Sequence, residues 1–244
     1  MTEATREDFH LDLGDVHIWE ADLDAASDQL PELRATLSML EVERADRFAH
    51  EKARHRFVAG RGIIRTLLAR YLQVDPRELS FTYTESGKPS INSANHPDLR
   101  FNLSHAGPTA LYAITRGREI GVDVEEADRQ VSDERIARRF FAPAEVAQLE
   151  ALPADERRQG FLRCWTRKEA YVKALGEGML SSPPSSFAVS LCPEEPALLN
   201  ATGTRAEQID RWRLEDLSVA GRYIAAVCLE AGEGYRVIRK DWGP

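Results

Sequence analysis

The stretch WTRKEAYVKALGEG, residues 165–178, is predicted to form the last turns of a helix. The run ends at Gly176 and Gly178, and glycine is the residue that most often follows a helix C-terminus. Glu169 and Lys173 are four residues apart, so they share one face of that helix. Such pairs are common surface features that stabilise a helix by about 0.2–0.5 kcal/mol. The tryptophan and glycines that frame this pair favour a specific site over a surface pair.

A second acidic motif lies upstream, in GVDVE at residues 121–125. Its valines alternate with Asp123 and Glu125, so a strand would place both carboxylates on one face. A strand with one solvated face explains this motif equally well when it is considered alone.

The two motifs together predict a metal site. If Glu169 faces Asp123 and Glu125 across a cleft, three carboxylates within about 4 Å repel by roughly 4 kcal/mol per pair at an effective dielectric of 20. Such a cluster requires a cation. Oxygen ligands without a His or Cys set favour Mg²⁺, which takes further ligands from substrate phosphates. The expected substrate is therefore a diphosphate or a similar anion.

Hydrophobic periodicity predicts an α+β fold. Residues 16–23 alternate like a strand, and residues 31–48 and 53–72 carry apolar residues at helical spacing. Strands are then expected at 79–84, 99–104 and 109–115. From residue 118 the order repeats, with a strand, helical stretches around 132–151 and 155–175, and strands within 186–191, 212–217, 222–229 and 235–238.

This repetition suggests two similar lobes. LSHAGPTALYAI at 103–114 resembles LSVAGRYIAAV at 217–227, which supports an internal duplication. We expect an N-terminal lobe over residues 1–117 and a C-terminal lobe over residues 118–244. The C-terminal lobe would carry the metal site, with the active site in the cleft between lobes that are related by a pseudo-two-fold axis. Such an internal pseudo-dimer is expected to be a monomer.

Composition excludes several classes of protein. The 244 residues carry a formal net charge of −8, so long-range attraction to nucleic acid is not expected. No run approaches the roughly 20 apolar residues that cross a bilayer, and the start has neither a basic region nor an apolar core for export. The three cysteines show no CxxC or Cys/His metal spacing. A reduced, cytoplasmic setting is expected.

Cations that could bind phosphate are concentrated in a few places. Lys88 lies in the turn SGKP, and Ser104 and His105 end a predicted strand in FNLSHAG, where side chains are readily presented to a ligand. A structural role is the commoner explanation for a lone histidine such as His105. Solvent exposure is likewise the commoner state of helix arginines, which here are Arg44, Arg47, Arg54, Arg56 and Arg61. The chain has no GxSxG elbow, and GRGIIR lacks the third glycine of a dinucleotide fingerprint.

In combination, these motifs resemble the signature blocks of the 4′-phosphopantetheinyl transferases, in particular the larger, two-lobed surfactin-synthetase-activating type. The resemblance runs from about Val42 to Val189. The blocks that carry it, in order, are RFAHEKARHRF, GRGIIRTLLARYL, SGKP, FNLSHAG, GVDVEEA, RRFFAPAEV and WTRKEAYVKALGEG. Loose matches to GVDVE are widespread, whereas the complete series at these separations is specific.

The resemblance implies transfer of the phosphopantetheine arm of coenzyme A onto a serine of an apo acyl or peptidyl carrier protein, with release of adenosine 3′,5′-bisphosphate. It implies Asp123, Glu125 and Glu169 as Mg²⁺ ligands and Glu169 as the general base. Lys173 would contact the phosphates and protonate the leaving group. The coenzyme A contacts that it implies are Arg44, Arg56, Lys88, Ser104, His105 and Lys173.

Differences from the family are few. Arg44 and Arg47 stand where lysine is frequent, and Phe57 stands where some members have a hydroxyl side chain. Lys168 has no chemical role by spacing and is expected to be structural or a salt-bridge partner.

Two other functions remain open from the sequence. One is a metal-dependent phosphodiesterase or nuclease, although such sites usually place Glu-x-Lys on a strand. The other is a non-catalytic module that binds carrier proteins or coenzyme A. The sequence leaves open the carrier and its pathway, the tolerance for acylated coenzyme A, and the choice between Mg²⁺ and Mn²⁺.

Overall fold

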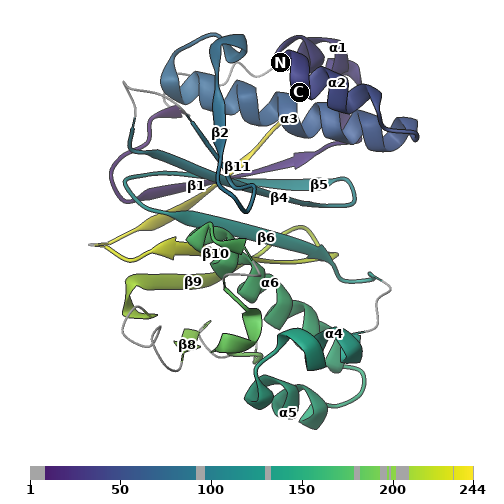
Figure 1. Ribbon diagram of the computed structural model, residues 1–244, viewed down its shortest axis with the longest axis vertical. Helices are drawn as coiled ribbons and strands as arrows, with labels where there is room; N and C mark the ends of the chain where they lie inside the picture. Colours follow the sequence, from purple (N-terminus) through teal and green to yellow (C-terminus); the bar gives the residue numbers. More distant parts are fainter. Residues whose placement is uncertain are drawn as a thin grey trace.

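The computed structural model describes residues 9–91, 97–129, 133–178, 182–192, 197, 199–201, 209–232 and 234–243. These residues form four layers, with helices, a sheet, a second sheet and further helices stacked along the long axis (Figure 1). The mixed helices and sheets confirm the predicted α+β class.

The first helical layer contains α1 (Leu30–Ala35), α2 (Met39–Asp46) and α3 (Glu51–Leu72). It covers a sheet of strand order β11-β1-β5-β4. Those strands are β1 (Asp15–Asp22), β4 (Leu99–Ala106), β5 (Thr109–Arg116) and β11 (Arg236–Asp241). A two-stranded hairpin of β2 (Phe81–Tyr83) and β3 (Pro89–Ile91) lies beside them.

The second sheet has the order β6-β10-β9. Its strands are β6 (Ile120–Glu126), β9 (Trp212–Leu217) and β10 (Tyr223–Glu230). The helices beyond it are α4 (Asp133–Phe140), α5 (Pro143–Ala151) and α6 (Arg157–Leu175). Small elements complete this part, namely β7 (Phe187–Val189), β8 (Leu199–Ala201) and a 3₁₀ turn at Pro184–Ser186. Two further 3₁₀ turns lie at Ala25–Gln29 and Pro76–Glu78.

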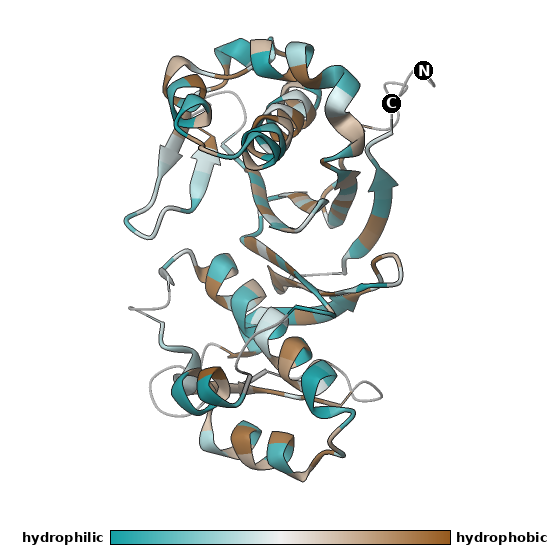
Figure 2. Cartoon of the chain, turned by 90° about the vertical axis from the view of Figure 1, so that its right-hand side faces the viewer, coloured by the Kyte–Doolittle hydropathy of each residue, from teal (hydrophilic) through white to brown (hydrophobic). Residues whose placement is uncertain are grey.

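Each pair of adjacent layers encloses a hydrophobic core. One core lies between α3 and the first sheet, and another lies between α6 and the second sheet. A third lies between the two sheets, where Val16 and Ile18 of β1 meet Val122 and Val124 of β6. In Figure 2, hydrophobic and hydrophilic residues alternate along the helices and strands, as expected for elements that bury one face.

The helix predicted over residues 31–48 is wrong as a single element. It breaks into α1 and α2 at Ser38, which adopts extended geometry (φ −68°, ψ 160°). Ser38 and Glu41 form a capping box that starts a new helix: the Glu41 amide donates to Ser38 Oγ, and the Ser38 amide donates to the Glu41 carboxylate.

The last strand of the chain lies in the first sheet. β11 pairs in parallel with β1, with Asp15 opposite Arg236 and Glu20 opposite Asp241. The chain therefore returns from the second sheet to the first before it ends (Figure 1). The division at residues 117 and 118 and the pseudo-two-fold relation between lobes stay predictions. By its pairing, β11 lies in the first sheet although it falls within the predicted range of the C-terminal lobe.

Candidate active site

The site is built where α6 lies directly on β6. A Cβ added to Gly121 would come within 2.1 Å of the Ala170 carbonyl oxygen and 2.3 Å of the Ala174 amide nitrogen. Only glycine therefore allows the helix backbone to approach the strand this closely. Because side chains alternate along β6, Asp123 shares the face of Gly121 while Val122 and Val124 enter the core between the sheets.

Asp123 and Lys173 form an ion pair on this face, with 2.7 Å between Lys173 Nζ and Asp123 Oδ1. Ser104, at the end of β4, donates its hydroxyl to the same carboxylate oxygen at 2.9 Å. Lys173 Nζ also lies 3.0 Å from Ser104 Oγ and 3.3 Å from the Val122 carbonyl. The structure therefore brings three of the predicted residues together from β4, β6 and α6.

Glu169 and Glu125 complete the cluster electrostatically. Burial, together with the Asp123 and Glu125 carboxylates, raises the pKa of Glu169 to about 7, against the opposing charge of Lys173. Burial also raises the pKa of Glu125, against a charged hydrogen bond from Arg129. The three carboxylates predicted to meet are therefore close enough for Asp123 and Glu125 to affect the pKa of Glu169.

Two carboxylates of this cluster are paired with cationic side chains in the structure. Within the described ranges, no three His, Cys, Asp or Glu side chains already converge as a metal cage. Asp123 is turned toward Lys173, and Glu125 toward Arg129. However, Asp123 Oδ2 is buried without a hydrogen-bond partner, and a buried carboxylate oxygen without one is costly. An oxygen-seeking cation would satisfy that atom and offset the mutual repulsion of the carboxylates, so the donor set fits Mg²⁺ chemically.

A pocket of about 820 Å³ opens between α2, α3 and the β2–β3 hairpin. His105 follows Ser104 along β4 and lines it. Partial desolvation at the pocket wall lowers the pKa of His105, and the positive charges of Lys173 and Arg56 lower it further.

Three of the helix arginines named from the sequence also line the pocket, namely Arg44, Arg56 and Arg61. Arg56 pairs with Asp24 at 2.7 Å, which fixes its guanidinium. Arg44 is exposed, and its guanidinium lies over the Phe57 ring at 5.2 Å from the centroid. The phenyl ring at position 57 thus supports a cation at the pocket mouth.

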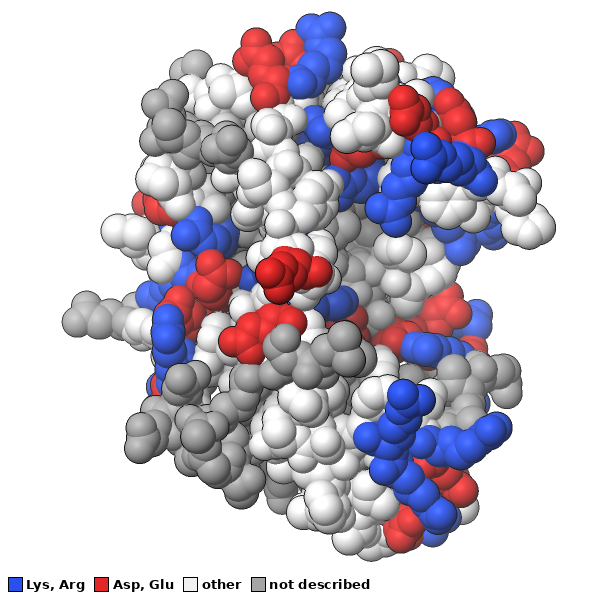
Figure 3. Space-filling model, in the orientation of Figure 1, with Lys and Arg blue, Asp and Glu red and all other residues white. Residues whose placement is uncertain are grey.

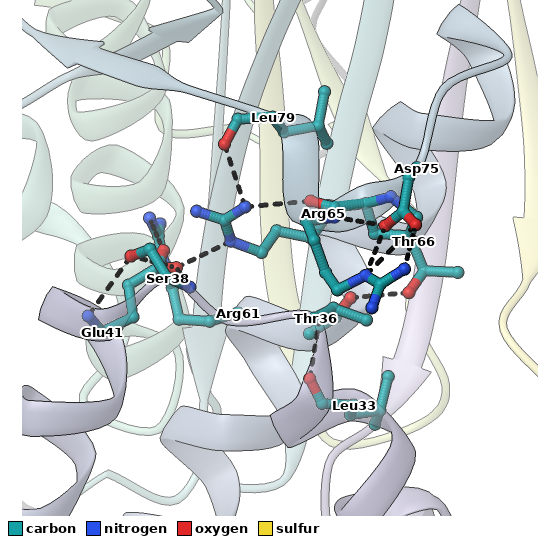
Figure 4. A network of polar contacts seen from close by, with 12 residues as sticks. Leu33, Thr36, Ser38, Glu41, Arg61, Arg65, Thr66, Asp75 and Leu79 are labelled. Atoms are coloured by element: carbon teal, nitrogen blue, oxygen red, sulfur yellow. Dashed lines mark hydrogen bonds and ion pairs between the residues drawn. The ribbon is translucent and has the colours of Figure 1, made fainter.

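Sequence reasoning missed a polar network that forms part of the pocket wall (Figure 4). Arg61 and Arg65 of α3 both bond the Glu41 carboxylate, and Arg65 also donates to the Pro76 and Leu79 carbonyls. Burial opposes ionisation of Glu41, but these arginines keep its pKa below the ordinary value. The Ser-x-x-Glu capping signature at Ser38 was the available signal, since it places Glu41 at the start of a helix.

Lys88 lies outside the pocket lining, although Gly87 and Pro89 contribute to it. Its ammonium contacts Glu119 at 2.7 Å and the Ala174 carbonyl at 2.9 Å. The structural role predicted for Lys168 is confirmed, because its buried ammonium pairs with Glu145 at 2.8 Å. It also donates to the Pro184 and Phe187 carbonyls at 2.6 Å each.

Comparison with known proteins identifies the family. Residues 119–228 match the 4′-phosphopantetheinyl transferase superfamily, and residues 23–116 match the 4′-phosphopantetheinyl transferase N-terminal family. The chain is 40% identical to the 4′-phosphopantetheinyl transferase HetI of Nostoc sp. over 91% of its own length and 90% of that protein.

The chain is also 37% identical to the 4′-phosphopantetheinyl transferase Sfp of Bacillus subtilis, over 61% of this chain and 64% of that one. Among solved structures, the holo-[acyl-carrier-protein] synthase of Thermotoga maritima matches 48% of this chain and 64% of that one. The TM-score is 0.38 and the identity 19%. On the sequence matches, this chain belongs to the 4′-phosphopantetheinyl transferase superfamily and is of the Sfp type.

Proposed function

We propose that the chain is an Mg²⁺-dependent enzyme that transfers the 4′-phosphopantetheinyl group of coenzyme A onto a serine of an apo acyl or peptidyl carrier protein. Family membership supports the reaction class. The assignment of the site rests on one observation: Asp123 bonds both Ser104 and Lys173. Glu169 lies close enough to Asp123 for that carboxylate to raise the pKa of Glu169.

In the proposed reaction, the serine oxygen bonds to the β-phosphorus of coenzyme A while the bond to the leaving adenosine 3′,5′-bisphosphate oxygen breaks. Glu169 takes the serine proton once the serine hydroxyl lies within hydrogen-bond reach of its carboxylate. Lys173 holds the diphosphate through its ammonium and supplies a proton to the leaving oxygen. Helix α6 fixes these two side chains relative to each other, which lowers the entropic barrier to reaction.

Asp123, Glu125 and Glu169 are the residues proposed to hold Mg²⁺, and its chemistry there would be to neutralise charge that develops on the phosphoryl oxygens. Lys173 would leave Asp123 Oδ1 for a phosphate when substrate binds. Of the predicted coenzyme A contacts, Arg44, Arg56, Ser104 and His105 are kept in this proposal, and Lys88 is left out because it lies outside the pocket lining. Their supporting observations are that Arg44, Arg56 and His105 line the pocket, and that Ser104 bonds Asp123 and Lys173.

The carrier is proposed to approach over α4 and α5. Lys and Arg side chains gather over this region of the surface (Figure 3). A second pocket, of about 440 Å³, lies among α4, α5 and α6 and includes Arg138, Arg157 and Arg158. A positive surface suits an acidic carrier helix.

The experiment that tests the function is incubation with Mg²⁺, coenzyme A and each of several apo carrier proteins, followed by intact-mass measurement of the carrier. We expect a gain of one phosphopantetheinyl mass. Glu169→Gln and Asp123→Ala are each expected to abolish that gain while the circular dichroism spectrum stays unchanged.

Other outcomes separate the remaining possibilities. Release of nucleotide without carrier modification would indicate a phosphodiesterase, and coenzyme A binding without either product would indicate a binding module. Near-normal turnover of the Glu169 or Asp123 variant would contradict the proposed metal site.

The setting of the enzyme is also a proposal. In the part of the chain that the structure describes, no helix combines the length and apolar character needed to span a bilayer. We propose a cytoplasmic monomer, and sedimentation at micromolar concentration would test the oligomeric state.

A further inference from the structure

The last turn of α6 is held by the hairpin of the first lobe. An α-helix ends with carbonyl groups that lack partners within the helix. In α6, the Gly176 amide closes the last helical hydrogen bond onto the Val172 carbonyl at 3.1 Å. The Ala174 carbonyl then accepts from Lys88 Nζ at 2.9 Å, and the Gly176 carbonyl accepts from Ser86 Oγ at 2.6 Å. Both donors come from the turn between β2 and β3.

The turn is itself held by internal hydrogen bonds, so it can hold the helix in place. The Gly87 amide donates to the Thr84 carbonyl at 2.9 Å, and the Thr84 amide donates to the Lys88 carbonyl at 3.0 Å. The Thr84 and Ser86 hydroxyls lie 2.7 Å apart. Gly87 has a φ of +88°, the left-handed region in which glycine carries no steric penalty.

The Lys88 ammonium contacts Glu119 as well as the end of α6. Its side chain is 12% exposed, and its ammonium pairs with Glu119 at 2.7 Å. Glu119 immediately precedes β6 and is also bonded by Arg100 at 2.8 Å. Lys88 thus ties the end of α6 to the start of β6, the strand that carries Asp123. A cation at this position also complements the negative end of the helix dipole.

We infer that Lys88 and Ser86 are positioning residues that cap the C-terminal turn of α6 from the opposite lobe and thereby set the register of Lys173 against Asp123. This inference rests on the proposed function. Lys173 immediately precedes Ala174, so displacement of the last turn moves the Lys173 side chain relative to the strand. The backbone of α6 lies directly on Gly121 of β6. The position of α6 is therefore fixed by β6 along its length and by the β2–β3 hairpin at its C-terminal end.

Lys88→Met and Ser86→Ala test the inference, with Ser90→Ala as the matched control. Ser90 lies in the same hairpin, and its hydroxyl contacts only Thr82 among the described hydrogen bonds. We expect kcat to fall about tenfold to a hundredfold in the Lys88 variant, since small displacements of catalytic groups have effects of this size. A smaller fall is expected for Ser86→Ala. The KM for coenzyme A should change less than about twofold, because the ground-state pocket is intact.

Glu119→Gln distinguishes positioning from direct phosphate binding by the sign of its effect. If Lys88 positions α6, weakening its partner lowers kcat in the same direction as Lys88→Met. If Lys88 instead binds the coenzyme A phosphates, removing the competing carboxylate lowers the KM for coenzyme A, while Lys88→Met raises it. That second pattern would overturn the inference.

Hydrogen–deuterium exchange of residues 170–176 gives a readout that does not depend on activity. Exchange should be faster in Lys88→Met and Ser86→Ala than in the wild type, and unchanged in Ser90→Ala. Unchanged exchange in the first two variants would overturn the inference. Absence of transfer by the wild type would contradict the proposed function alone, and the exchange result would still decide whether the hairpin holds the helix.

Discussion

Two lysines of α6 show how position on one helix separates roles. Lys168 and Lys173 are five residues apart, which places their side chains about 140° apart around the axis. Lys168 therefore enters the core and pairs with Glu145, while Lys173 faces β6 and pairs with Asp123. The spacing in the sequence predicted that the two lysines have different roles. The element that each lysine faces determines its role.

At the residue scale, the raised pKa of Glu169 predicts how the stability of the fold depends on pH. Its folded pKa of about 7 lies above the ordinary 4.5, so the folded protein binds this proton more tightly than the unfolded chain. Stability should therefore fall as pH rises from about 4.5 through 7, and the full penalty applies above that window. In EDTA at pH 8, Glu169→Gln should raise the free energy of unfolding by on the order of 1–3 kcal/mol.

Urea unfolding at pH 4 and pH 8, with EDTA or Mg²⁺, measures this effect. The advantage of the variant should vanish at pH 4, where the carboxyl is protonated in both states. Added Mg²⁺ should stabilise the wild type at pH 8 and leave the variant nearly unchanged, because a ligand stabilises only the state that binds it. Identical pH profiles for the two proteins would contradict the assigned burial of Glu169.

At the element scale, two glycines of α3 differ in what surrounds them. A Cβ at Gly60 would approach no closer than 3.8 Å to the Tyr112 hydroxyl, whereas a Cβ at Gly62 would lie 2.5 Å from Leu33 Cβ. Gly60→Ala should therefore stabilise the protein by about 0.5–1 kcal/mol through helix propensity. Gly62→Ala should destabilise it by about 1–3 kcal/mol, because α1 must move away from α3.

The two variants are controls for each other, since both make the same substitution in one helix. Their urea midpoints should lie on opposite sides of the wild-type value. Equal midpoints would show that α1 does not pack on α3 at Gly62.

Two arginines of helix α4 are predicted to contact the carrier protein. Arg138 is 69% exposed and lies 3.4 Å from Glu150, and Arg139 covers the Phe140 ring. Charge reversal at both arginines should raise the KM for an acidic carrier about tenfold and change the KM for coenzyme A less than twofold. Arg213→Glu, an exposed substitution on β9, serves as the control. Equal effects on both substrates would argue against docking at α4.

At the scale of the whole molecule, β11 joins the end of the chain to its beginning. The Trp242 amide donates to the Glu20 carbonyl at 2.8 Å, and Arg239 pairs with Glu20 at 2.6 Å. Val237 packs against the core between the sheets, and Trp242 packs against the core of α3. The strand also covers the outer edge of β1, which would otherwise be free to pair with another chain.

Ending the chain after Tyr235 should therefore lower the free energy of unfolding by about 3 kcal/mol or more, through lost burial of Val237 and Trp242. The shortened protein should also self-associate through the exposed edge of β1, as seen by size-exclusion chromatography. Ending the chain after Trp242 is the control and should behave as the full chain does. Equal stability of all three would contradict a structural role for β11.

The sequence by itself determined the local elements and supplied the residues of the proposed site. Helical spacing marked α3 and α6, alternation marked β1 and β6, and the acidic and basic residues of the cluster were identified from their motifs. These features depend on neighbours within a few residues, and periodicity reports them directly. The break at Ser38 was missed because helical spacing continues across it, although its capping signature was present.

Tertiary structure alone decided how those elements meet. The return of β11 to β1, the contact of α6 with Gly121, the Glu41 network and the contacts of Lys88 all join residues far apart in the chain. Each depends on which surfaces pack together and on which buried polar groups need partners. Which of these long-range contacts form depends on the free energy of the whole fold, and a local sequence pattern does not report it.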